Sequence, residues 1–110
     1  MEKVTLFQFE NSNIKVLMEI YFNEKGQLRF DGQDIGKYVE GVSGSSEYEY
    51  FYNIEPAEAN KFYEIFMLND GDHAGLLGAI KKDFGVNKAF TLFGEFMLAH
   101  NIKHERFICN

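Results

Sequence analysis

Residues 14–22 read IKVLMEIYF. The apolar side chains at every second position, from Ile14 to Phe22, alternate with Lys15, Leu17, Glu19 and Tyr21. An alternation with a period of two is typical of a strand that turns one face to the core. We therefore expect a strand over residues 14–22, in a sheet with one buried face.

Neighbouring segments predict further strands. Residues 4–10 are rich in β-branched and aromatic residues and precede the turn signal at residues 11–13, and a second turn at residues 23–26 leads into a strand at residues 27–30. Residues 31–34 resemble a loop, followed by a short helix over residues 35–39. In the strand expected at residues 47–54, Tyr48, Tyr50, Tyr52 and Ile54 share one face, and Glu47, Glu49, Phe51 and Asn53 share the other.

Helical signals dominate the second half of the chain. Pro56 begins a helix that we expect to run to about Leu68. A second helix over residues 73–84 ends at Gly85, and a third, capped by Asn87, ends near residue 101 with His100 turned inward. Residues 103–109 predict an added strand. This order predicts a single α+β domain over residues 1–110, with a mostly antiparallel sheet of four to five strands and helices packed on one face.

Length and composition narrow the class of protein. The chain has 110 residues, of which 45% are hydrophobic and 16% aromatic, and this excludes intrinsic disorder. The single cysteine, Cys109, allows no internal disulfide, so we expect a reducing, cytoplasmic compartment. No signal-peptide pattern or membrane-spanning run is found in the sequence, and we expect no membrane association.

The charge is unevenly distributed. Residues 31–64 hold eight acidic residues against two basic ones, and this accounts for the whole net charge of −6. The same segment holds five of the six tyrosines. Acidic side chains attract a basic partner, and tyrosine supplies contact area at low entropic cost, so this segment favours binding to a basic protein. The alternative is a solvated surface that keeps the protein soluble.

Metal-binding and cofactor motifs are weak. His100 and His104 have the i, i+4 spacing of a zinc-binding helix, but we expect the helix to end between them. Asp70-Gly71-Asp72 resembles part of a calcium loop, but the twelfth position is Lys81 and not glutamate. We expect neither a metal nor a cofactor.

Enzymatic and nucleic-acid functions are also disfavoured. Glu47 and Glu49 would lie about 7 Å apart on one strand face, as an acid/base pair requires, but a glycosidase also needs a deep cleft. Nucleic-acid binding needs clustered lysine and arginine, and the basic groups at residues 81–88 and 103–106 are small and interrupted by acids. The tyrosine face at residues 48–52 could stack bases, but the alternative is that it lies beneath the helices.

Two short motifs carry a resemblance to a known family. Residues 30–40 read FDGQDIGKYVE and residues 47–50 read EYEY. Together with the size and acidity, this pattern resembles the immunity proteins of bacterial contact-dependent inhibition and related polymorphic toxin systems. Residues 41–46 lack the aromatic residue associated with that loop. The resemblance implies a cytoplasmic inhibitor that occupies the basic site of a toxin, with carboxylates in place of phosphates.

We therefore expect a non-enzymatic immunity protein that binds and neutralises a cognate toxin. The class of toxin that we favour is a nuclease. The alternative is a small acidic regulatory or adaptor module that binds another basic protein, and an acidic-site hydrolase ranks third. The candidate partner-binding residues are Asp31, Asp34, Tyr38, Glu40, Glu47, Glu49, Tyr50 and Glu55.

Overall fold

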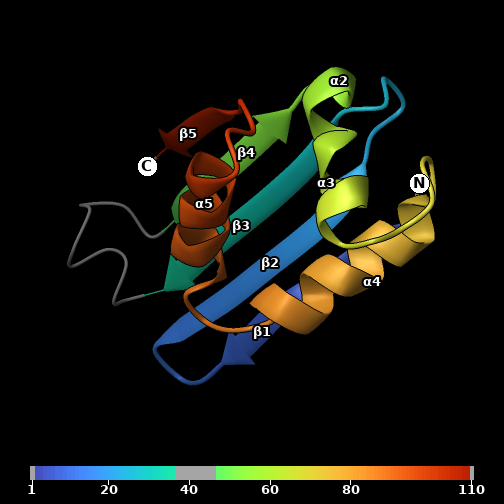
Figure 1. The fold of residues 1–110 in the computed structure, drawn as a ribbon. Helices are drawn as coiled ribbons and strands as arrows, with labels where there is room; N and C mark the ends of the chain where they lie inside the picture. The colour runs from blue at the N-terminus through green and yellow to red at the C-terminus, as the bar shows by residue number, and fades with distance from the viewer. Residues whose placement is uncertain (1, 37–46, 110) are drawn as a thin grey trace.

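The computed structural model describes residues 2–36 and 47–109, and in them five strands form one antiparallel sheet. The strands are β1 (Lys3–Glu10), β2 (Ile14–Phe22), β3 (Leu28–Gly36), β4 (Glu47–Ile54) and β5 (Glu105–Cys109). Their order in the sheet is β1-β2-β3-β4-β5, so each strand pairs with its neighbours in the sequence (Figure 1). The predicted antiparallel α+β sheet is confirmed.

Helices cover one face of this sheet, which we call the helix side (Figure 1). They are α2 (Pro56–Ala59), α3 (Lys61–Ile65), α4 (His73–Phe84) and α5 (Ala89–Ala99). α4 begins at an N-cap, Asp72, whose side chain accepts a hydrogen bond of 2.9 Å from the backbone nitrogen of Gly75. α4 ends at Gly85, as predicted.

The core lies between the sheet and the helices. The alternation predicted for β2 is confirmed, because Val16, Met18 and Ile20 are buried. The tyrosine strand follows the same rule, since Tyr50, Tyr52 and Ile54 are buried on the helix side while Tyr48 is half-buried. The alternative that the tyrosine face of this strand lies beneath the helices is therefore confirmed. Tyr52 also donates a hydrogen bond of 2.7 Å to the backbone oxygen of Phe90 in α5.

The loop predicted at residues 31–34 is wrong, because β3 continues through it to Gly36. Glycine and aspartate are poor strand formers, but β3 is paired on both sides along this stretch. Pairing with two neighbours outweighs the weak intrinsic preference of these residues. The predicted helix over residues 35–39 is wrong at residues 35 and 36, and its remainder lies outside the described residues.

The helix predicted from Pro56 to Leu68 is two shorter helices, which end at Ile65. Met67 adopts a left-handed φ of 56°, and the backbone nitrogen of Leu68 donates to the oxygen of Tyr63, which closes the helix end. The predicted cap at Asn87 is also wrong, since α5 is preceded by Lys88 and has no side-chain cap. His100 is exposed and not inward.

Gly32 allows close packing at the centre of the sheet. A Cβ atom at this position would overlap the ring of Tyr50, the cross-strand neighbour of Gly32 on the helix side. Tyr50 in turn packs edge-on against Phe90, with 4.8 Å between the ring centroids. A side chain at position 32 would therefore displace a buried ring.

Candidate functional site

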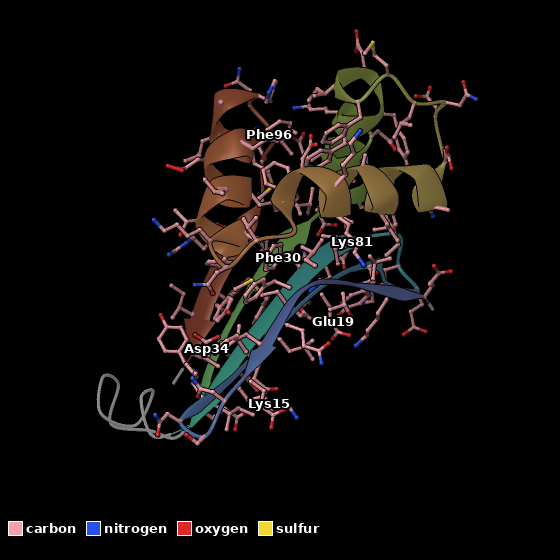
Figure 2. The ribbon with its side chains drawn as sticks, turned by 90° about the horizontal axis from the view of Figure 1, so that it is seen from below. Lys15, Glu19, Phe30, Asp34, Lys81 and Phe96 are labelled. Carbon is pink, nitrogen blue, oxygen red and sulfur yellow. The ribbon has the colours of Figure 1, made fainter. Side chains whose placement is uncertain are left out.

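The face of the sheet opposite the helices, which we call the open face, is the candidate site. Strand alternation turns every second side chain toward it, and Figure 2 shows Lys15 and Glu19 pointing away from the helices while Phe30 points toward them. By register, the charged side chains of the open face are the acidic Glu10, Glu19, Asp31, Glu47, Glu49 and Glu105 and the basic Lys3, Lys15 and Arg29. The face therefore carries net negative charge.

A groove of about 310 Å³ lies on this face, over β2, β3 and β4. Its lining combines carboxylates with apolar surface, and includes Leu17, Glu19, Arg29, Asp31, Glu49 and Phe51. We call it the open-face groove. A hollow with apolar surface and acidic groups suits the insertion of a long basic side chain, whose methylene groups bury while its charge is paired.

Asp31, which lines the groove, is held by two neighbouring side chains. The Tyr21 hydroxyl donates a hydrogen bond of 2.6 Å to Asp31 Oδ2, and Arg29 Nη2 lies 3.1 Å from Oδ1. Burial, together with the hydrogen bond to Asp31, raises the pKa of Tyr21 to about 12. Because Arg29 compensates its charge, Asp31 contributes less to the field of this face than an unpaired carboxylate would.

Glu49 and Glu47 lie side by side on β4. A hydrogen bond with Glu47 and the charge of Glu47 together raise the pKa of the Glu49 carboxyl. Gln33 Nε2 donates a hydrogen bond of 2.6 Å to Glu47 Oε1, so this pair is anchored to β3. Two adjacent carboxylates repel each other when both are ionised, and a cation placed beside them would relieve that repulsion.

An aromatic row crosses the open face from the groove to the edge of the sheet. The Arg29 guanidinium carbon lies 4.4 Å from the ring centroid of Phe51, a cation–π contact. Phe51 stacks on Phe107 of β5, with the ring centroids 4.6 Å apart. The Phe107 side chain is 40% exposed, so the row ends in accessible aromatic surface.

The other predicted residues lie elsewhere. Asp34 and Tyr50 are on the helix side, where the Tyr50 hydroxyl donates a hydrogen bond of 2.7 Å to Asp34 Oδ1 and burial raises the Tyr50 pKa. Asp34 lines a second hollow, of about 330 Å³, together with the cationic Lys88 and Arg106. That hollow is therefore of mixed charge.

Glu55 follows β4 at the far end of the strand from Glu47. Its carboxylate accepts hydrogen bonds from Gln27 (2.7 Å) and Asn53 (2.9 Å). Tyr38 and Glu40 lie outside the described residues. The structure thus brings Asp31, Glu47 and Glu49 together on one face and separates them from Asp34 and Tyr50.

Sequence reasoning missed Glu19, Arg29 and Phe51 as site residues. The signal was present for Glu19, because the alternation of residues 14–22 already placed it on the face away from the core. The roles of Arg29 and Phe51 depend on the pairing of β3 with β4, which no local pattern specifies.

Within residues 2–36 and 47–109, no three His, Cys, Asp or Glu side chains are grouped so as to hold a metal ion. None of the helices in the same residues has the length and apolar character needed to cross a membrane. Comparisons with protein-family models, with curated proteins and with solved structures found no match.

Proposed function

We propose that this chain is a non-enzymatic immunity protein that binds and neutralises a cognate toxin, most of all a nuclease, through the open face of its sheet. The observation that carries the proposal is the open-face groove, in which Glu19 and Glu49 lie beside the apolar Leu17 and the ring of Phe51. The resemblance of residues 30–40 and 47–50 to immunity proteins supports a toxin as the basic partner.

Electrostatic attraction and apolar burial have separate roles in this binding. A nuclease is basic around its active site because it holds a polyanion. The acidic face of this chain therefore raises the association rate of the two proteins, and added salt reduces this effect. The aromatic row and the groove then supply the apolar surface on which lasting affinity depends. The inhibitor performs no chemistry, since occupying the partner is sufficient.

The first experiment is co-expression with the product of the gene immediately upstream, which the proposal expects to encode a toxin domain. We expect the chain to restore growth and to form a stable complex with the purified domain. If the upstream gene encodes no toxin and no growth is restored, the immunity proposal is wrong. Binding to a basic protein unrelated to toxins would then favour an adaptor.

The second experiment locates the binding face by charge reversal. The double variant Glu19→Lys and Glu49→Lys changes two acids of the open-face groove. Glu64→Lys and Asp83→Lys make the same change of net charge on α3 and α4, where both residues are exposed. We expect the groove variant to associate at least about ten-fold more slowly at low salt, with a flatter salt dependence, and the helix variant to stay close to wild type. Equal effects of the two variants would remove the open face from the interface.

A further inference from the structure

The outer edge of β5 is the least protected part of the sheet. β5 pairs with β4 on one side only, and no other strand in the described part of the chain lies along its other side. All five of its residues are exposed, including Phe107 and Ile108, which are 40% and 42% exposed on opposite faces. An edge strand with free backbone groups and apolar side chains is a template for another strand.

The opposite edge of the sheet, β1, is protected. Its pairing with β2 is interrupted by a bulge between Thr5 and Phe7, and α4 packs against it. Bulges and covering helices are the devices by which proteins prevent edge-to-edge pairing. β5 has neither proline nor lysine, and its register with β4 is continuous. The contrast indicates that the β5 edge is less protected against pairing than the β1 edge.

Charge determines what kind of strand fits β5. On the open face, the charged side chains of β1, β2 and β3 balance, with Glu10, Glu19 and Asp31 against Lys3, Lys15 and Arg29. β4 and β5 carry Glu47, Glu49 and Glu105 on that face and no basic side chain. The net negative charge of the open face therefore lies beside the unprotected edge. Cross-strand neighbours of opposite charge stabilise a sheet, so an added strand should present basic side chains on this face.

The other side of β5 also fits an added strand. Ile108 offers an apolar neighbour there, and Arg106 is turned toward α5, with its guanidinium carbon 5.5 Å from the ring centroid of Phe90. Arg106 is thus already engaged with this protein's own helix. A strand that alternates basic and apolar residues would meet acids and Phe107 on one face and Ile108 on the other.

A second copy of the chain is a poor occupant of this edge. Parallel self-pairing in register would place Glu105 of one copy beside Glu105 of the other. Antiparallel self-pairing centred on Phe107 would place Glu105 of one copy beside Cys109 of the other, and Cys109 is the cross-strand neighbour of Glu49. Both arrangements bring acids toward acids, between chains that each carry a net charge of −6. Like charges that face each other across strands are destabilising.

The geometry points to β-strand addition: an extended segment of the partner, alternating basic and apolar residues, pairs with the outer edge of β5 and extends the sheet. This inference rests on the proposed function, because it specifies how the basic partner docks. Backbone hydrogen bonds along β5 hold the segment, and its basic side chains reach over Phe107 toward Glu49 and Glu105.

A peptide tests the inference without the toxin. The probe is a short synthetic peptide in which arginine alternates with valine, titrated into the isotope-labelled full chain and followed by amide NMR. We expect shifts centred on Glu105–Cys109 and at least about ten-fold weaker binding when every backbone nitrogen of the peptide is methylated. Shifts confined to β1 and β2, or equal binding of the methylated peptide, would overturn the inference.

The matched variants Phe107→Lys and Phe9→Lys test it in the complex with the upstream toxin domain. Both phenylalanines are exposed on edge strands, but at opposite edges of the sheet. We expect Phe107→Lys to weaken binding at least about ten-fold, because a lysine on an edge strand opposes strand addition and a basic partner, and Phe9→Lys to change it less than about two-fold.

The failure of this inference and the failure of the proposed function are distinguishable. If the toxin domain binds, but the amides of β5 exchange hydrogen as fast as in the free chain and the two variants behave alike, strand addition is wrong and toxin binding stands. If the peptide pairs with β5 and the toxin domain does not bind, the proposed function alone is wrong. Concentration-dependent dimers in sedimentation, with the amide shifts in β5, would assign the edge to a second copy and overturn the inference.

Discussion

Gly32→Ala tests the packing beneath the open-face groove. The added methyl group would overlap the ring of Tyr50, which is only 6% exposed and cannot move freely. Phe90 packs against that ring, and the Tyr50 hydroxyl donates a hydrogen bond to Asp34. Overpacking of this kind costs about 1–3 kcal/mol. Losing the hydrogen bond to Asp34 adds about 1 kcal/mol, while the lower entropy of the unfolded alanine chain offsets about 0.4–1 kcal/mol. We expect a net loss of about 1–3.5 kcal/mol.

Urea unfolding, followed by circular dichroism, measures this loss. The control is Gly78→Ala in α4, where an added Cβ would meet nothing within 4 Å, and there we expect a gain of about 1 kcal/mol because alanine favours a helix. In a Tyr50→Ala background the overlap is gone, so Gly32→Ala should cost less than about 0.5 kcal/mol. If Gly32→Ala is as stable as wild type, or costs the same with and without the Tyr50 ring, the packing described here is wrong.

Three further predictions concern single side chains. Because the pKa of the Glu49 carboxyl is raised in the folded chain, the folded chain binds the carboxyl proton more tightly than the unfolded chain does. This proton therefore contributes to stability at pH values below the ordinary pKa of 4.5, and the contribution is lost as the pH rises through the raised pKa. Urea unfolding across this range should show wild type losing stability relative to Glu49→Gln as pH rises. Tyr21→Phe should remove one phenol that titrates at about 12 from the ultraviolet absorbance titration; a lost phenol near 10 would contradict the contact with Asp31. Asp72→Ala should cost about 1 kcal/mol by removing the cap of α4, whereas Asp70→Ala should change the unfolding free energy by less than about 0.5 kcal/mol.

Much of the fold follows from local patterns. The period-two alternation predicts β2 and β4, and from the sequence alone it places Glu49 and Tyr50 on opposite faces. α4 is equally predictable, because its apolar stripe and Gly85 mark its extent. These elements have strong signals because each has one face in the core and one in solvent.

The failures occur where pairing or helix closure overrides propensity. Residues 31–34 contain two aspartates and a glycine, which resemble a loop, but β2 and β4 pair with them on both sides. The helix after Pro56 ends early because Met67 takes a left-handed φ, a conformation that glycine and asparagine signal but methionine does not. Non-local hydrogen bonds determine the first result, and a single backbone torsion determines the second.

Strand parity explains why the predicted site divides between two faces. Asp31 and Asp34 are three residues apart, so in one continuous strand their side chains must point to opposite faces, and only a loop would have allowed them to converge. Conversely, Glu105 is far from Glu49 in sequence but stands in the adjacent strand on the same face. A charged patch on a sheet is assembled by register and not by proximity in sequence. The charge of segment 31–64 therefore predicts that an acidic face exists, whereas the pairing of β4 with β5 determines where its net charge lies.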